Sequence, residues 1–307
     1  MLLEFSIEEC VCEVFIVSVN NITKKYAANK GVFDLSFTIG EGEVFGFLGP
    51  NGAGKTTTIR HLLGFIRPDS GSATILGQDC WRETKSIQRQ LGYLPAEIAL
   101  PSHMTGTELI QHASRMRGLS SSGKAQALID RFELDPSIPV KRMSKGMKQK
   151  VSIICAFMHD PQVIVLDEPT TGLDPLMQAA FVSLIKEEKA QGKSILMSSH
   201  LFEEVEGTCD RIGIIKQGRL VSIAHANEFI RMNRTVYVLT FGNASDYESF
   251  QQGPFAITSS DDNRLQLTIE MEEGRINSLI QALASHELVS LRESQASLES
   301  HFMAFYH

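Results

Sequence analysis

The stretch that decides the fold is rich in glycine and reads Gly49-Pro50-Asn51-Gly52-Ala53-Gly54-Lys55-Thr56-Thr57. The residues before it, 43–48, are mostly apolar and predict a buried strand, and residues 57–66 after it predict an amphipathic helix. A glycine-rich turn between a strand and a helix is typical of a phosphate-binding loop, whose backbone N–H groups point inward at an anion. The positive end of the following helix strengthens that attraction. The sequence therefore predicts a site for nucleotide phosphates in an α/β fold.

Two side chains of this loop carry specific chemistry. Lys55 would place a full positive charge on the β and γ phosphates, and the hydroxyl of Thr56 would be a ligand for Mg²⁺. The other residues of the loop would bind phosphate through the backbone. The alternative, an ordinary glycine-rich turn, is disfavoured by the strand–loop–helix order.

Two carboxylates follow a second apolar strand, residues 163–166, at Asp167 and Glu168. Ligands of open α/β sheets gather at the carboxyl ends of the strands, so Asp167 is expected beside the phosphate loop, where it would hold Mg²⁺ directly or through water. Glu168 is expected to accept a proton from the water that attacks the γ phosphate. The alternative is a surface turn with two acids.

Size and composition describe an ordinary globular protein. The chain has 307 residues, of which 43% are apolar and 21% charged, and its length favours two domains of unequal size. No apolar run reaches the roughly 18 residues that span a bilayer. Residues 1–19 contain four glutamates and lack the basic start of a signal peptide, so we expect no export. A net charge of −7 argues against a nucleic-acid partner.

The five cysteines predict a reduced compartment, because they are scattered and odd in number. Cys10 and Cys12 are spaced closely enough to bind a metal, but no second pair accompanies them.

Changes of pattern along the chain predict its domains. Residues 1–15 form an N-terminal extension of uncertain role, residues 16–226 one α/β domain with a helical subdomain at about 98–160, and residues 227–307 a small α+β domain. Cap residues mark three helix starts, at Thr105, Ser144 and Asp174. Residues 211–215 and 219–223 predict a hairpin, and short strands, one helix at 275–284 and a last helix from Ser297 are expected after it.

These residues together resemble the ATP-binding subunit of an ABC transporter, over about residues 17–225. Besides the loop and the carboxylate pair, the resemblance rests on three segments. The family's signature corresponds to Met143-Ser144-Lys145-Gly146-Met147, and its D-loop corresponds to Gly172-Leu173-Asp174-Pro175. Its switch histidine corresponds to His200 in Ser198-Ser199-His200. The fold it implies is a P-loop NTPase of ABC type with an antiparallel β subdomain and a helical subdomain.

The resemblance implies a dimer that hydrolyses ATP with Mg²⁺ and powers a separate integral membrane permease at the cytoplasmic face of the cell membrane. Two subunits, expected to be identical, would face head to tail, with each ATP between the phosphate loop of one and the signature of the other. Ser144, Gly146 and Asp174 would then contact the partner's nucleotide. The basic residues from Lys141 to Lys150 would lie near triphosphate; for Lys148 and Lys150 a solvated helix face is the alternative.

Two further roles follow from the resemblance. His200 would contact the γ phosphate and orient Glu168 and water, with a generic buried histidine as the alternative. Tyr26 stands where the family has a ring that stacks on adenine, with an ordinary strand tyrosine as the alternative.

The chain departs from the family at two positions. Lys145 replaces the first of two signature glycines, although Ser144 and Gly146 remain. Ala96 stands where the family has a glutamine that ligates Mg²⁺, and alanine cannot ligate a metal. Glu97 would take that role if the loop shifts by one residue.

The end of the chain, with Ala296-Ser297-Leu298-Glu299 before Phe302 and Tyr306, is similar to the subfamily of drug, antibiotic and ion exporters; a generic capped helix is the alternative. The hypothesis is therefore an exporter ATPase. Two others are a soluble ABC-type ATPase that acts on ribosomes or nucleic acid, and a regulatory module that binds ATP without hydrolysis.

Overall fold

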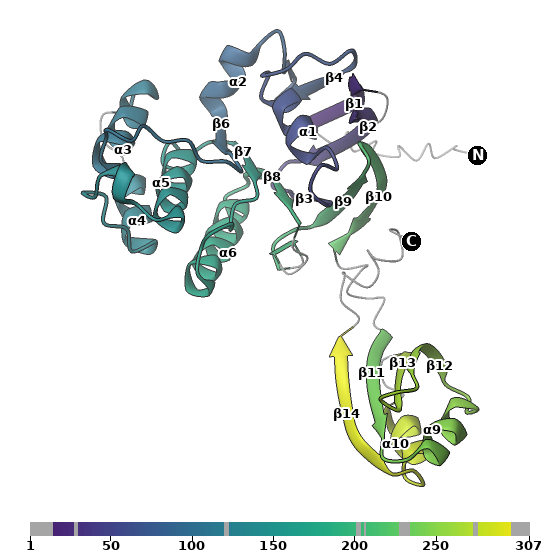
Figure 1. Ribbon diagram of the computed structural model, residues 1–307. Coiled ribbons are helices and arrows are strands. Elements are labelled where there is room, and N and C mark those ends of the chain that lie inside the picture. The colour runs from purple at the N-terminus through teal and green to yellow at the C-terminus, as the bar shows by residue number, and fades with distance from the viewer. Residues whose placement is uncertain are drawn as a thin grey trace, which may run out of the picture. The chain divides into compact units, whose positions relative to one another are not determined.

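A computed structural model describes residues 15–27, 30–119, 123–200, 204–205, 207–226, 234–272 and 276–295, and these form two compact units, 1–225 and 226–307 (Figure 1). Residues 1–14 of the expected N-terminal extension and the helix expected from Ser297 lie outside the described residues, as do Cys10 and Cys12, whereas Phe15 already belongs to the first strand. Within the described ranges, no helix combines the length and the apolar character that crossing a bilayer requires.

A six-stranded sheet forms the centre of the first unit, in the order β10-β9-β3-β8-β7-β6. Its strands are β3 (Val44–Leu48), β6 (Leu91–Leu94), β7 (Val163–Asp167), β8 (Ser194–Ser199), β9 (Arg211–Lys216) and β10 (Arg219–His225). All neighbours pair in parallel except β9 and β10, which form the predicted hairpin. Because β3, β7 and β8 are buried on both faces, their central residues are apolar, and polar side chains occur only at the ends of β7 and β8.

An antiparallel sheet packs on one face of β3. Its strands, in the order β2-β1-β4-β5, are β1 (Phe15–Ala27), β2 (Lys30–Gly40), β4 (Ser70–Ile75) and β5 (Gln78–Asp79). Phe37 of β2 stacks on Phe45 of β3 with ring centroids 5.2 Å apart, and it also contacts Phe47. The antiparallel β subdomain that the resemblance implies is therefore present. It covers the face of β3 on which the alternation of strands and helices alone would place helices.

Helices complete the first unit, and their bounds are α1 (Lys55–Leu62), α2 (Thr84–Gln90), α3 (Gly106–Met116), α4 (Gly123–Arg131), α5 (Lys145–Phe157) and α6 (Pro175–Ala190), with a short 3₁₀ turn at Val140–Arg142. Three of them, α3, α4 and α5, lie together at one end of the unit (Figure 1). The expected cap residues are confirmed: Thr105 forms a capping box with Glu108, and the side chains of Ser144 and Asp174 accept hydrogen bonds from N–H groups of their helices.

The second unit is a four-stranded antiparallel sheet with two helices on one face. Its strands have the order β12-β13-β11-β14 and its elements are β11 (Arg234–Phe241), α9 (Ala244–Gln251), β12 (Ala256–Asp261), β13 (Gln266–Glu272), α10 (Ile276–Leu283) and β14 (Leu288–Gln295). Tyr247 and Phe250 of α9 pack with Leu279 of α10 on the buried face of the sheet. The strands and α10 follow the sequence prediction, whereas α9 is absent from it.

A buried ion-pair cluster joins α4 to α6. Glu188 of α6 is only 2% exposed. Its carboxylate accepts a hydrogen bond from Lys193 at 2.5 Å and forms an ion pair with Lys124 of α4 at 2.6 Å. Asp160 also forms ion pairs with both lysines. Burial alone would lower the pKa of Lys193, but its hydrogen bonds to Asp160 and Glu188 outweigh burial and raise it. The cluster therefore keeps a buried ammonium charged and attaches the helical end of the unit to α6.

Replacement of Glu188 tests this cluster. We expect Glu188→Ala to lower the free energy of urea-induced unfolding by about 3 kcal/mol, because it leaves the charge of Lys193 buried with a single partner. Glu187→Ala is the matched control, since Glu187 pairs with Arg131 at the surface and its loss should cost less than about 1 kcal/mol. Equal losses in the two variants would contradict the assignment.

Candidate nucleotide and phosphoryl-transfer site

The phosphate loop connects β3 to α1, and two of its glycines adopt backbone conformations that other residues avoid. Gly52 has φ 80° and Gly54, the N-cap of α1, has φ 114°. Gly49 has no such angle but allows close packing, because a Cβ there would lie 2.5 Å from the carbonyl oxygen of Ile215. The loop is thus packed closely against β9.

The turn of the β9–β10 hairpin is hydrogen-bonded to the phosphate loop. The N–H of Gly218 donates to the carbonyl oxygen of Ala53 at 2.8 Å, and the carbonyl of Gly218 accepts from the N–H of Phe33 in β2 at 2.7 Å. The same turn therefore contacts the phosphate loop and the antiparallel sheet.

Lys55 is buried at the centre of the loop. Its ammonium donates to the carbonyl oxygens of Gly49 at 2.5 Å and Pro50 at 3.3 Å and lies 3.8 Å from the Glu168 carboxylate. Burial lowers the pKa of Lys55, and the negative charges of Glu168 and Asp167 oppose that shift. A phosphate group would offer this ammonium a stronger acceptor than the two neutral carbonyls do.

Asp167 ends β7 beside the loop, with only 1% of its surface exposed. One carboxylate oxygen accepts from the hydroxyl of Thr56 at 2.8 Å, and the other accepts from the hydroxyl of Ser198 at the end of β8. Thr56 and Asp167 offer the hard oxygen donors that Mg²⁺ prefers, and Mg²⁺ in phosphate sites takes few protein ligands besides water and phosphate. The residues present therefore fit Mg²⁺.

Glu168 is held in an unusual backbone conformation, with φ 50°. Its N–H donates to both the carbonyl and the hydroxyl oxygen of Ser198, each at 3.2 Å. Its carboxylate lies 3.5 Å from Nδ1 of His200, which follows β8. A carboxylate that lies between the side chains of Lys55 and His200 is suited to orient a water molecule.

Sequence reasoning missed Ser198 as a site residue. This serine bonds to both members of the carboxylate pair, through its hydroxyl and its carbonyl. The parallel pairing of β7 and β8 sets Asp167 opposite Ser198, and the spacing of these residues in the sequence does not reveal this register.

The signature residues pack against another segment. A Cβ on Gly146 would lie 2.6 Å from the carbonyl oxygen of Gly172, and Gln149 donates to the carbonyl of Pro169 at 2.5 Å. The carboxylate of Asp174 accepts from the N–H of Met177, so it serves as a helix cap. Among the described residues, no hydrogen bond or ion pair joins Ser144, Gly146 or Asp174 to the phosphate loop of the same chain.

The remaining predicted residues lie elsewhere in the first unit. Tyr26 lies on β1 and is 57% exposed, which leaves a face of its ring open for stacking. Ala96 and Glu97 follow β6, whose end is paired with the end of β7; Ala96 is half-buried and Glu97 exposed. The role of Glu97 as a metal ligand stays a prediction.

The sheet, the loop at its carboxyl edge and the buried carboxylate define a P-loop NTPase. Comparison with known proteins matches residues 32–171 to the family described as ABC transporter. The linearmycin resistance ATP-binding protein LnrL of Bacillus subtilis is 32% identical over 94% of this chain and 97% of its own length. The bacitracin transport ATP-binding protein BcrA of Bacillus licheniformis is 30% identical over 94% and 96%.

A solved ATP-binding subunit of an ABC transporter superposes with a TM-score of 0.65 at 32% identity, over 71% of this chain and 92% of that one. A dimeric cassette in a post-hydrolysis state, bound to ADP and Pi, has a TM-score of 0.62 at 23% identity and covers 68% of this chain and 98% of its own, which supports the fold. The chain belongs to the ABC transporter family. It is an ATPase, the ATP-binding subunit of an exporter, and the predicted fold class is confirmed.

Replacement of Ser198 tests the position of the two carboxylates. We expect Ser198→Ala to lower kcat of ATP hydrolysis about tenfold with a smaller change in KM, because a hydrogen bond to a charged group contributes about 1.5 kcal/mol or more. Ser152→Ala is the control, because Ser152 is also buried and its hydroxyl has no hydrogen-bond partner. Unchanged kcat in Ser198→Ala would show that Asp167 and Glu168 hold their positions without it.

Proposed function

We propose that two copies of this chain close head to tail on two ATP molecules and thereby drive a separate integral membrane permease at the cytoplasmic face of the cell membrane. The observation that carries the proposal is the separation of the two halves of the site. Lys55, Thr56, Asp167, Glu168 and His200 form one connected group, whereas, within the described residues, no hydrogen bond or ion pair joins Ser144, Gly146 or Asp174 to the phosphate loop. A second subunit would bring a signature to each phosphate loop.

The residues of this chain divide the chemistry between binding and proton transfer. Backbone N–H groups of the loop, the N-terminus of α1 and the Lys55 ammonium would hold the β and γ phosphates. Mg²⁺, held by Thr56 and Asp167, would offset negative charge on the phosphates. Glu168 would accept the proton of the attacking water, with His200 orienting the carboxylate and the γ phosphate.

The helical end of the first unit is suited to transmit closure. Arg117, which follows α3, donates to the carbonyl oxygens of Gln88 at 2.5 Å and Leu91 at 3.2 Å. Leu91 begins β6, and β6 leads to Ala96 and Glu97, the loop that signals to the permease in the family. A displacement of α3 would therefore be transmitted to this loop through the two hydrogen bonds that the Arg117 guanidinium donates. Such coupling requires ATP to bind the closed dimer more tightly than the open one.

The cargo class that we propose is an antimicrobial compound. Support comes from two relatives that align over nearly their whole length, one named for linearmycin resistance and one for bacitracin transport. This chain would hydrolyse ATP, whereas the cargo would contact the permease. No observation favours the ribosome or nucleic-acid alternative.

The decisive experiment compares the chain with its Glu168→Gln variant. We expect Mg²⁺-dependent ATP hydrolysis in the parent chain and a loss of at least about 100-fold in the variant, because glutamine cannot accept the proton of water. ATP binding should persist, and size-exclusion chromatography in ATP should show the variant as a trapped dimer.

Glu187→Gln serves as the matched control for removal of a carboxylate, because Glu187 pairs with Arg131 at the surface, away from the site. Turnover lost only in Glu168→Gln, with a trapped dimer, would support the proposal. A parent chain that binds ATP and never hydrolyses it, even when purified with its permease, would support the binding-only regulatory alternative.

Gly146 tests the role of the signature in the partner's site. We expect Gly146→Ala to weaken ATP-dependent dimer formation at least about tenfold, because the added methyl group forces the start of α5 away from Gly172 at a cost of about 1–3 kcal/mol. ATP binding by the separate subunit, measured by calorimetry, should be unchanged. Gly123→Ala is the control, since a Cβ there meets no described residue within 4 Å.

A further inference from the structure

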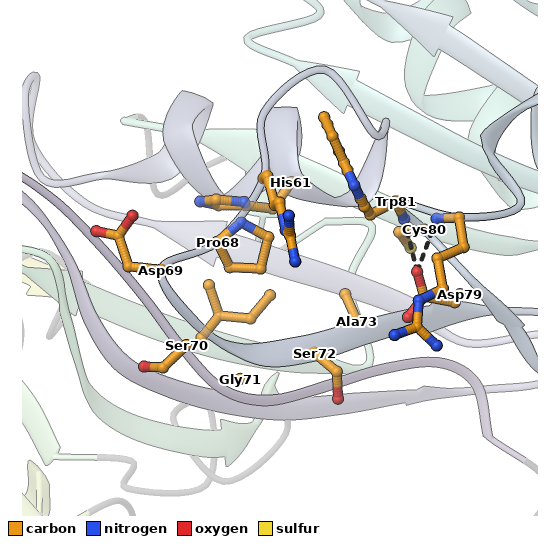
Figure 2. Close-up of a pocket in the computed structure, with 13 residues that line it drawn as sticks. His61, Pro68, Asp69, Ser70, Gly71, Ser72, Ala73, Asp79, Cys80 and Trp81 are labelled. Carbon is orange, nitrogen blue, oxygen red and sulfur yellow. Dashed lines mark hydrogen bonds between the residues drawn. The ribbon is translucent and has the colours of Figure 1, made fainter.

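A small pocket lies at the end of α1 that is remote from the phosphate loop. It has a volume of about 180 Å³ and is enclosed by the C-terminal end of α1, the start of β4 and the segment after β5 (Figure 2). His61 in the last turn of α1 and Lys55 in its first turn are six residues apart, or roughly 9 Å along the helix axis. The pocket is therefore separate from the nucleotide site and has a different lining.

His61 presents an unused hydrogen-bond acceptor to this pocket. The side chain is 2% exposed, and Figure 2 shows its ring directed into the space between Pro68 and Trp81. Its Nδ1 lies 3.1 Å from the carbonyl oxygen of Ile66, which assigns the proton to Nδ1. Its Nε2 is buried and has no hydrogen-bond partner among the described residues. A buried polar atom without a partner is costly, so a ligand that donates to Nε2 would relieve that cost.

The protonation state of His61 supports the acceptor role. Burial lowers the pKa of His61. The charge of Lys24 acts in the same direction, whereas the hydrogen bond that the ring donates to the carbonyl oxygen of Ile66 and the charge of Asp69 oppose it. The ring is therefore neutral at pH 7, and Nε2 keeps its lone pair.

The pocket lining carries two arginines and two aspartates, and both aspartates are already hydrogen-bonded. Asp69 accepts hydrogen bonds from the ammonium of Lys24 at 2.7 Å and from the N–H of Lys25 at 2.8 Å. Asp79 accepts hydrogen bonds from the N–H groups of Trp81 and Arg82. Within the described residues, the guanidinium groups of Arg67 and Arg82 form no ion pair, and both line the pocket. A guanidinium recognises a carboxylate through two parallel hydrogen bonds.

The walls of the pocket favour a flat ring. Trp81 is 45% exposed and lines the pocket together with Pro68 and Ala73. An indole offers a large apolar face on which another ring can stack, and the pocket volume limits the guest to the size of one ring with small substituents.

We propose that this pocket binds a small aromatic carboxylic acid that carries a ring O–H or N–H group. The ring stacks against Trp81, the carboxylate pairs with Arg67 and Arg82, and the ring substituent donates to Nε2 of His61. The pocket borders the helix that carries Lys55 and Thr56, so its occupant contacts the same helix as ATP.

The single tryptophan of the chain gives a direct readout. In the ¹⁵N-labelled full chain, the only indole N–H signal belongs to Trp81. We expect 4-hydroxybenzoate and 4-aminobenzoate to shift this signal in a saturable way with a Kd of about 1 mM or tighter. Benzoate should bind at least about tenfold more weakly, because it leaves Nε2 of His61 without a donor.

Two variants separate binding from a structural effect. Arg82→Ala changes an exposed side chain and should weaken binding at least about tenfold, whereas Arg89→Ala on the exposed face of α2 should not. His61→Phe keeps a ring and should abolish the preference for 4-hydroxybenzoate over benzoate; if it fails to fold, Arg82→Ala and the benzoate comparison still decide.

Three results would overturn the proposal. They are no saturable shift with either acid, equal affinity for benzoate, and unchanged affinity in Arg82→Ala. Repeating the titration in saturating ATP identifies the site, since a shift that ATP abolishes by competition would place the probe at the phosphate loop and also overturn it.

Discussion

The carboxylate of Asp167 is the group on which the rest of the site depends. An ionised carboxylate that is almost fully buried is tolerable only when each oxygen is hydrogen-bonded or metal-bound. Here the two oxygens are divided between the hydroxyls of Thr56 and Ser198, so one side chain connects the start of α1 with the ends of β7 and β8. The parallel sheet makes this possible, because it brings these strand ends to one edge.

Within the described part of the chain, the adjacent residue, Glu168, is held in place through its backbone rather than through hydrogen bonds to its carboxylate. Its backbone has a conformation that non-glycine residues rarely adopt, and conformations of this kind cost about 1–3 kcal/mol. Two hydrogen bonds from its N–H to Ser198 hold it there. Consecutive residues at a strand end would otherwise point to opposite faces, so the left-handed turn redirects the second carboxylate toward Lys55 and His200.

Local signals in the sequence predicted most of the fold, and long-range contacts explain what was missed. Thr105 and Asp174 are helix caps whose bonds reach three residues along the chain, so the sequence reveals them. Helix α9 has a cap at Asn243, but its short body lacks a clear apolar period and was overlooked. The contribution of Ser198 and the close approach of Gly146 to Gly172 depend on segments that are distant in sequence. Their spacing carries no comparable signal.

The turn at Gly218 has a mechanical consequence. It is hydrogen-bonded on one side to the phosphate loop and on the other to β2, the neighbour of the strand that carries Tyr26. The side of the site that faces the phosphates and the strand expected to face the base are therefore connected through one turn. In the proposed dimer, the free energy of ATP binding would then drive motions of the helical end and of the partner subunit rather than a hinge between these two parts.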